Sequence, residues 1–159
     1  MPEIPTSSLT LLLGIGNEAR RDDGVGLAIA RRLALSPPPG CRVEVASPDG
    51  ASLLEHWRGA RAVLTFDAAW ASGRPGAVLE LRPDALGPIQ PAATSGHRLG
   101  LAEAVALARA LGEMPDQFEV LAVVGEDFGY GFGLTAAVEA AVDEVVARVR
   151  GRYHVTGAA

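Results

Sequence analysis

Three side chains in this 159-residue sequence have the chemistry to bind a metal ion together: the carboxylates of Asp23 and Asp67 and the imidazole of His97. The two aspartates come after apolar runs, and the histidine opens a helical pattern. Two carboxylates and one imidazole form a mixed nitrogen and oxygen ligand set, which suits a divalent transition metal and leaves coordination positions open. This chemistry requires a fold that brings three distant parts of the chain together.

The elements that would position these residues alternate between short apolar runs and longer helical patterns. The apolar runs predict five strands, at residues 8–14, 42–47, 62–68, 77–83 and 118–125. The helical patterns predict helices at 25–35, at 52–59 with Ser52 as its cap, at 97–111 and at 134–151. This order predicts a three-layer α/β/α sandwich around a five-stranded, mostly parallel sheet with one antiparallel strand.

The strand at 77–83 is predicted to be the antiparallel one. Only about nine residues separate it from Asp67, whereas a parallel crossover needs about a dozen or more. The other strands would deliver Asp23, Asp49 and Asp67 to their carboxyl edge, where ligands bind in such sheets. The loop at 84–96 can extend by roughly 40 Å, so His97 can return to that edge. We therefore expect Asp23, Asp67 and His97 to converge.

Each of these residues also has a purely structural interpretation. Asp22 and Asp23 stand at the start of a helix, where carboxylates commonly cap N–H groups and interact favourably with the helix dipole. Asp67 fits a turn residue after a strand, and His97 fits the first turn of its helix. Convergence of the whole set on one edge is what favours the metal-site interpretation.

A nucleotide site is a further alternative for the stretch GIGNEARRDDGVG at residues 14–26, because Gly14, Gly16 and Ala19 satisfy the pattern G-x-G-x-x-G/A. The fit is poor, since a charged insert precedes the helix and its two carboxylates would repel a pyrophosphate. In addition, Asp49 comes too late for the acid that binds a ribose. We expect instead that the glycines turn the chain so that the acids face a cleft.

The remaining reactive side chains are predicted to be structural or exposed. His56 lies in a short amphipathic helical pattern and is expected at the surface, and Cys41 is expected to be structural rather than nucleophilic. The glycine-rich stretch GEDFGYGFG after the fifth strand contains Glu126 and Asp127. It is expected to be a loop whose acids could join the same edge.

Composition and charge restrict the class of protein. A net charge of −5 disfavours nucleic acid as a partner, and the single cysteine excludes an internal disulfide or a thiolate-rich zinc site. No apolar run reaches the roughly 20 residues of a membrane span, and no basic segment precedes the first apolar run as in a signal peptide. We expect one cytoplasmic domain over residues 1–159 with a tail at about 152–159, no membrane partner, and an oligomeric state that the sequence leaves open.

The spacing of the glycines and acids resembles that of the hydrogenase maturation endopeptidases. Their motif, G-x-G-N, four residues, then D-D-G-x-G, is formed here by Gly14, Gly16, Asn17, Asp22, Asp23, Gly24 and Gly26. The resemblance continues in order through PDG at 48–50, the acid Asp67, SGHRLGL around His97 and GLTAAVEAAV at 133–142. It thus spans nearly the whole chain. Ala51 and Ser52 depart from the Gly-Thr that often follows the family's D-G.

The resemblance implies an endopeptidase with an α/β/α sandwich fold. Its reaction would be a single cut that removes the C-terminal extension of a [NiFe]-hydrogenase large-subunit precursor after nickel insertion, with the nickel supplied by the precursor. The nickel-contacting residues would be Asp23, Asp67 and His97, with Asp23 and Asp67 also the candidate catalytic residues. The motif residues expected to shape the cleft, with no chemistry assigned to them, are Asn17, Asp22, Asp49 and Gly50.

Two mechanisms and two other functions stay open at this point. The nickel ion could polarise the scissile carbonyl or a water molecule, or Asp23 could act as a general base. A non-catalytic nickel-binding or assembly chaperone with the same fold would bind the precursor without cutting it. A nucleotide-binding module would instead be stabilised by NAD or ATP and unaffected by nickel.

Overall fold

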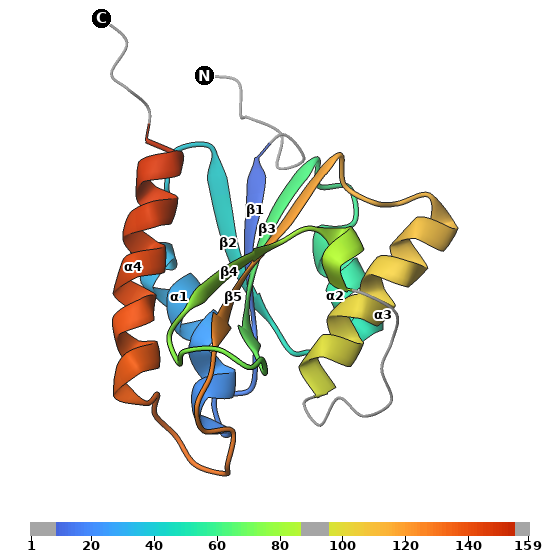
Figure 1. Ribbon diagram of the computed structural model, residues 1–159. Helices are drawn as coiled ribbons and strands as arrows, with labels where there is room; N and C mark the ends of the chain where they lie inside the picture. Colours follow the sequence, from blue (N-terminus) through green and yellow to red (C-terminus); the bar gives the residue numbers. More distant parts are fainter. Residues whose placement is uncertain (1–8, 87–95, 155–159) are drawn as a thin grey trace, which may run out of the picture.

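The computed structural model describes residues 9–86 and 96–154, and side chains over residues 9–84 and 100–154. Its centre is a five-stranded sheet in the order β2-β1-β3-β5-β4 (Figure 1). The strands are β1 (Thr10–Ile15), β2 (Cys41–Ala46), β3 (Ala62–Ala69), β4 (Val78–Leu81) and β5 (Gln117–Val124). Each falls within two or three residues of its predicted position, because apolar runs bounded by turn residues mark strands well.

Helices cover both faces of the sheet, so the predicted α/β/α sandwich is confirmed (Figure 1). One layer holds α1 (Val25–Ala34) and α4 (Ala136–Arg152), and the other holds α2 (Gly50–Trp57) and α3 (Gly96–Leu111). The described residues also include the short 3-10 helices η2 (Arg21–Gly24), which leads into α1, and η3 (Pro83–Leu86), which follows β4. The predicted tail at 152–159 overlaps the end of α4, and its last five residues lie outside the described part of the chain.

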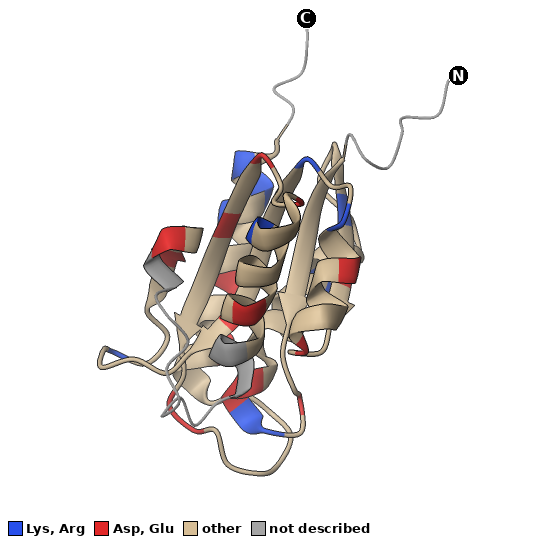
Figure 2. Ribbon diagram, turned by 90° about the vertical axis from the view of Figure 1, so that its right-hand side faces the viewer, with Lys and Arg blue, Asp and Glu red and all other residues tan. Residues whose placement is uncertain are grey.

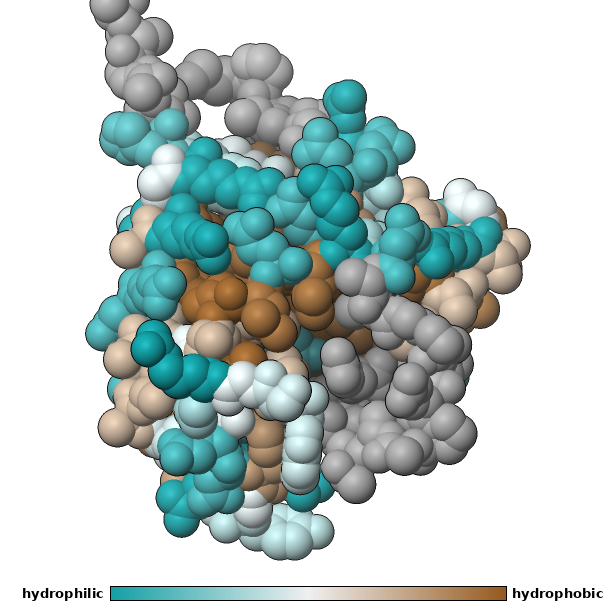
Figure 3. Space-filling model, viewed as in Figure 1, coloured by the Kyte–Doolittle hydropathy of each residue, from teal (hydrophilic) through white to brown (hydrophobic). Residues whose placement is uncertain are grey.

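Strand β4 is the antiparallel strand, as predicted from its short connection, and it lies at the edge of the sheet. Among the described strands it pairs only with β5, from Val78 opposite Val123 to Leu81 opposite Val120. Apolar side chains gather on the surface over this strand (Figure 3). Leu79 and Leu81 pack against the core on the α2–α3 side of the sheet.

Side chains along β3 alternate between the two layers, as the pleat of a strand requires. Leu64 and Phe66 belong to the core beneath α1 and α4, whereas Val63 belongs to the core beneath α2 and α3. Thr65 and Asp67 share the parity of Val63, so they face the α2–α3 layer. Both are buried, which makes this end of the α2–α3 core polar.

Two glycines allow α1 to lie directly on the sheet. A Cβ atom at Gly26 would come within 2.3 Å of the carbonyl oxygens of both Ile15 and Phe66, and one at Gly14 would be 2.3 Å from the carbonyl oxygen of Gly26. The space beside these glycines is therefore filled by the protein's own backbone. They act by close helix–strand packing. Gly14 lies within β1 and Gly26 within α1, so the turning role expected from the sequence was wrong for these two glycines.

Helix α2 begins earlier than predicted and has a different cap. The Asp49 carboxylate accepts hydrogen bonds from the backbone N–H groups of Ala51 and Ser52, so Asp49 is the N-cap and Ser52 lies inside the helix. The prediction of Ser52 as the cap was wrong, because a preceding aspartate offers a charged acceptor for the same orphan N–H groups.

The described helices include none that is both long enough and apolar enough to cross a membrane. The side of the molecule that carries α2 and α3 has acidic and basic residues interspersed along it (Figure 2). Ion pairs such as Arg58–Glu113, at 3.0 Å, join α2 to the segment after α3.

The packing of α1 on the sheet gives a first prediction. Gly26→Ala should lower the free energy of unfolding by about 3 kcal/mol, because its methyl group has to displace two strand carbonyls. Gly151→Ala is the matched control, since a Cβ atom at Gly151 meets nothing within 4 Å. It should leave the stability unchanged or raise it by up to about 1 kcal/mol. Urea unfolding followed by circular dichroism measures both, and equal stabilities of the two variants would contradict the packing role.

Candidate functional site

The candidate site lies at the carboxyl edge of the parallel strands, the lower edge in Figure 1. Strand β1 is followed there by η2, β2 by the start of α2, and β5 by residues 125–135, here called the β5–α4 segment. Helix η2 also lies against β3, which carries Asp67. Asp23 and Asp67 are therefore positioned by contacting elements at one edge, as the sequence predicted.

Asp67 is fixed by a strand in the middle of the sheet. Its side chain is 3% exposed, and its Oδ1 atom accepts a hydrogen bond of 2.8 Å from the backbone N–H of Ala68. Thr65, two residues earlier on the same face, is fully buried, and its hydroxyl makes no hydrogen bond within the described part of the chain. The sequence analysis did not single out Thr65, because one threonine in a strand carries no distinctive signal.

Asp23 is held by the turn that connects β1 to α1. Its side chain is 3% exposed, and its backbone carbonyl accepts a hydrogen bond of 3.2 Å from Asn17 N–H. A Cβ atom at Gly16 would lie 2.2 Å from that carbonyl oxygen, so the glycine lets the turn close tightly. The Asn17 side chain stabilises the same turn by accepting a bond from Ala19 N–H.

Asp22 has a different role from its neighbour, because its carboxylate binds the β5–α4 segment. It accepts hydrogen bonds from the backbone N–H groups of Glu126, Asp127 and Thr135, at 2.8–3.0 Å, and from the Thr135 hydroxyl. The side chain is fully buried. Among the described residues, the N-cap residues of η2 and α1 make no side-chain capping bond, and the Asp22 carboxylate bonds to another segment. The interpretation of Asp22 as a cap of its own helix was therefore wrong. Its hydrogen-bond partners are more than 100 residues away in the sequence, and local sequence patterns give no signal for such contacts.

These hydrogen bonds also set the ionisation of Asp22. Burial raises the pKa of its carboxyl, but the hydrogen bonds from Thr135, Asp127 and Glu126 outweigh that effect and hold the pKa below its ordinary value of 3.8. The group is therefore a carboxylate at neutral pH, and its negative charge is stabilised by hydrogen bonds within the fold.

Asp49 and Gly50 connect the candidate site to the α2–α3 layer. Asp49 is exposed and caps α2, whereas Gly50 is buried. A Cβ atom at Gly50 would be 3.1 Å from the Gly100 carbonyl oxygen, and one at Gly100 would be 1.9 Å from the Pro48 carbonyl oxygen. Residues 48–50 therefore hold the N-terminal half of α3 against the sheet edge.

His97 lies in the first turn of α3, one turn before Gly100. This places its backbone at the same edge as the end of β2, in agreement with the return of the chain predicted from the sequence. Its side chain lies outside the described residues, so the predicted cluster of Asp23, Asp67 and His97 stays a prediction. Over the described residues, no group of three or more histidine, cysteine, aspartate or glutamate residues is arranged to hold a metal ion.

The β5–α4 segment carries aromatic side chains that the sequence analysis did not assign. Phe128 stacks on Trp70, which follows β3, with ring centroids 5.2 Å apart and an interplanar angle of 14°. The Arg20 guanidinium lies 5.1 Å from the centroid of the Tyr130 ring and donates a hydrogen bond to the Phe128 carbonyl. The segment expected to be a plain loop is thus tied to η2 and to β3.

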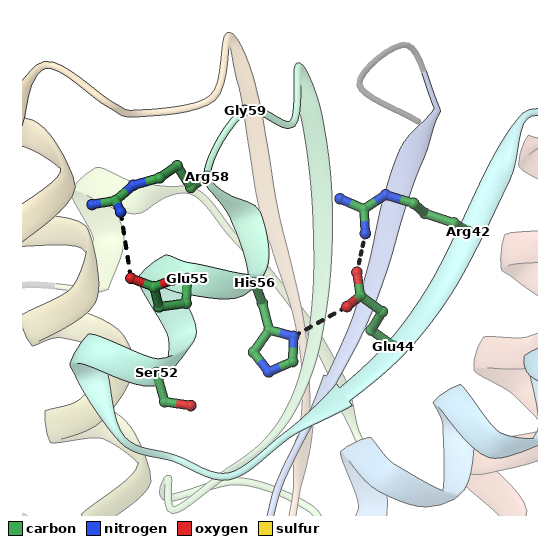
Figure 4. A pocket seen from close by; sticks show the side chains of 7 residues that line it. All are labelled: Arg42, Glu44, Ser52, Glu55, His56, Arg58 and Gly59. Atoms are coloured by element: carbon green, nitrogen blue, oxygen red, sulfur yellow. Dashed lines mark hydrogen bonds and ion pairs between the residues drawn. The ribbon is translucent and has the colours of Figure 1, made fainter. Parts of the chain in front are cut away.

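A separate pocket of about 510 Å³ lies between the edge strand β2 and α2 (Figure 4). His56, expected to be exposed, is partly buried here, and its Nδ1 atom lies 3.2 Å from the Glu44 carboxylate, which also pairs with Arg42. Arg58 pairs with Glu55 on another wall of the pocket. The charges of the described lining residues therefore compensate one another.

Cys41, at the start of β2, is buried as predicted for a structural cysteine. Burial raises the pKa of its thiol to about 11, so the thiol stays protonated at neutral pH. A protonated, buried thiol is a poor nucleophile.

Comparison with known proteins identifies the family. The sequence model of the hydrogenase maturation proteases matches residues 46–151, which include Asp49, Asp67 and His97. The chain belongs to the hydrogenase maturation protease family. This confirms the resemblance that the motifs predicted. Asp22 and Asp23 precede the matched region, so their assignment depends on the motif and the fold.

Two curated relatives extend the likeness beyond the matched region. The hydrogenase expression/formation protein HupD of Rhodobacter capsulatus is 30% identical over 143 residues, which cover 86% of this chain and 67% of HupD. The hydrogenase 2 maturation protease of Escherichia coli is 28% identical over 142 residues, which cover 87% of both chains.

Solved structures of family members share the fold. The hydrogenase maturating endopeptidase HybD of Escherichia coli superposes with a TM-score of 0.78 at 26% identity and covers 91% of both chains. The [NiFe] hydrogenase maturation protease HybD of Thermococcus kodakarensis gives a TM-score of 0.69 at 26% identity, over 91% of this chain and 99% of that one. The family is thus one of endopeptidases built on this sandwich.

The Asp22 hydrogen bonds predict a pH-dependent loss of stability. Because the folded pKa is depressed, the contribution of Asp22 is complete well above pH 3.8 and is lost as the pH falls below that value towards the folded pKa. Asp22→Asn should therefore lower the free energy of unfolding by about 2 kcal/mol or more at pH 7, and the gap to the parent should narrow towards pH 3.

The control for this measurement is Asp116→Asn, at an ion pair whose carboxylate is 78% exposed. Exposed pairs contribute little, so this variant should follow the parent within about 0.5 kcal/mol at each pH. Urea titrations at a series of pH values measure all three proteins. A gap between parent and Asp22→Asn that stays constant from pH 7 to pH 3 would refute the assignment.

Proposed function

We propose that this chain is the endopeptidase that removes the C-terminal extension of a [NiFe]-hydrogenase large-subunit precursor once nickel has been inserted. Membership of the maturation protease family supports the reaction class and the substrate. The observation that carries the proposed site is the pair of buried carboxylates, Asp23 and Asp67, on contacting elements at the carboxyl edge of the sheet.

Asp23, Asp67 and His97 would contact the nickel ion presented by the precursor. Carboxylate and imidazole groups are suitable donors for this metal. The burial of both aspartates lowers the local dielectric, which strengthens their attraction for a cation that approaches the edge. The proposed ion would supply Lewis-acid chemistry to the scissile carbonyl or to a water molecule.

The two aspartates differ in how they are supported, which suggests a division of roles. Asp67 stands on a central strand and keeps a bond to its own neighbour's N–H, so it is suited to a fixed contact. Asp23 stands on a short turn beside the substrate-facing edge, and it is the candidate general base for the attacking water. In that role its carboxylate would take the proton from the water as the water oxygen attacks the carbonyl carbon, and would pass it to the leaving nitrogen as the C–N bond breaks.

Processing of the precursor tests the proposed residues directly. Asp23→Asn, Asp67→Asn and His97→Ala should each slow the cut by about 100-fold or more, since each removes a group proposed to act at the reacting atoms. Asp116→Asn is the matched control and should cleave at the parental rate. The appearance of the shortened large subunit on a denaturing gel measures the rate, with folding checked by circular dichroism.

Processing of the precursor by Asp67→Asn at the parental rate would contradict the proposed site. A parent protein that binds the precursor and leaves it at full length would instead support the assembly-chaperone alternative. Stabilisation by NAD or ATP, with no effect of nickel or precursor, would support a nucleotide-binding module.

Removal of the metal gives an independent prediction. A precursor prepared without nickel should stay at full length when mixed with the parent protein, and loading that precursor with nickel should restore the cut. Magnesium serves as the control ion, because imidazole is a poor ligand for it and it should not restore processing. Equal cleavage of nickel-free and nickel-loaded precursor would show that the metal is not needed.

A further inference from the structure

Exposed aromatic side chains gather at the edge that carries Asp23 and Asp67. The chain has two tryptophans, two tyrosines and four phenylalanines, all within the described residues. Three of these rings are more than half exposed: Trp70 at 55%, Tyr130 at 87% and Phe132 at 74%. All three lie on the segments that follow β3 and β5 at the candidate site.

The backbone that carries Tyr130 and Phe132 is fixed to η2 and to the residues before it. Gly131, between Tyr130 and Phe132, accepts a hydrogen bond from Arg21 N–H and donates one to the Ala19 carbonyl, both at 2.9 Å. Arg21 is two residues before Asp23, so the aromatic residues stand directly beside the turn that carries the candidate base.

Trp70 is positioned from the other side by two contacts. Its ring stacks on Phe128, and the Phe128 ring in turn lies against the backbone at Gly125, where a Cβ atom would be 2.4 Å away. The Gly125 N–H donates to the Ala69 carbonyl at 3.0 Å, which fixes the start of the β5–α4 segment beside Trp70. The backbone that carries the three rings is therefore fixed, and the Trp70 ring is also held by its stacking on Phe128.

A hollow of about 530 Å³ adjoins this segment. It is lined by Arg74 and Gly76 of the β3–β4 connection, by Glu126, and by Ala137, Ala141 and Glu144 of α4. Its volume is in the range of pockets that accept small ligands or a few side chains. Small alanine side chains on one wall leave room for the side chains of a bound segment.

We propose that Trp70, Tyr130 and Phe132 form a docking surface for the apolar polypeptide segment that flanks the scissile bond of the precursor. This inference rests on the proposed function. Trp, Tyr and Arg are the residue types that dominate the binding energy of protein interfaces, and here Arg20 lies over Tyr130. Because the backbone that carries these rings is already fixed, binding has to order only their side chains.

The position of the surface argues for this occupant. An endopeptidase has to hold the chain on at least one side of the cut, and the aromatic surface is continuous with the turn that carries Asp23 through the Arg21–Gly131 hydrogen bond. Leu35 and Leu111 are also exposed, but they lie at the C-terminal ends of α1 and α3, and both helices begin at the candidate-site edge and run away from it. They provide matched controls for the same loss of apolar surface.

Fluorine NMR of the protein labelled with 5-fluorotryptophan tests the contact, because the chain has only two tryptophans. Trp57 is fully buried against Phe118 and serves as the internal reference. Addition of unlabelled precursor, or of a synthetic peptide that spans its cleavage junction, should move the Trp70 resonance and leave the Trp57 resonance in place. Movement with the folded precursor but not with millimolar peptide would overturn the flanking segment as the occupant.

Kinetics test the contribution of the other two rings. The double variant Tyr130→Ser/Phe132→Ser should raise KM for the precursor by about tenfold or more, with the loss falling on KM rather than on kcat, because uniform binding is removed. The control Leu35→Ser/Leu111→Ser should keep the parental KM. Equal KM values for the two double variants would overturn the docking surface.

The two readouts separate this inference from the proposed function. If the parent cuts the precursor while Trp70 stays in place and KM is unchanged, the docking surface is wrong and the protease assignment stands. If Trp70 moves but the precursor stays at full length, the docking surface stands and the protease assignment fails. If neither cutting nor movement is seen, both are overturned.

Discussion

The buried carboxylate of Asp22 is the interaction on which the site edge depends. Its hydrogen bonds to the backbone at Glu126, Asp127 and Thr135 join the turn after β1 to the start of α4. The partner of each bond is a backbone N–H, so the geometry is set by the chain rather than by flexible side chains. This junction positions Asp23 and the aromatic residues of the β5–α4 segment.

The adjacent aspartates of the motif thus divide structure from chemistry. The Asp22 carboxylate accepts hydrogen bonds inside the fold, whereas the backbone of Asp23 is held by Asn17 and by contact with Gly16. Buried ionised groups are costly unless they are hydrogen-bonded, and Asp22 meets that requirement. The D-D-G sequence consequently combines an anchor, a candidate reactive group and a helix start within one turn.

Much of this architecture could be predicted from the sequence. Periodicity indicated the strands and helices, the short connection before β4 required an antiparallel edge, and the ends of β1 and β3 placed Asp23 and Asp67 at one edge. The role of Asp22 could not be predicted, because its partners are remote and are backbone groups, which have no residue signature. The same limit applied to the cap of α2, where Asp49 and Ser52 are both good acceptors and only the geometry decides between them.

The large sequence separation of the residues joined by Asp22 has a consequence for folding during synthesis. Hydrogen bonds between residue 22 and residues 126–135 are long-range contacts, and contacts of large sequence separation close late in folding. A ribosome-bound chain that ends before β5 already contains both aspartates, but it has no partner for Asp22 and no fixed turn at Asp23. The candidate site is therefore assembled only when synthesis of the chain is nearly complete. A nascent chain that ends before β5 lacks the hydrogen bonds that fix this site.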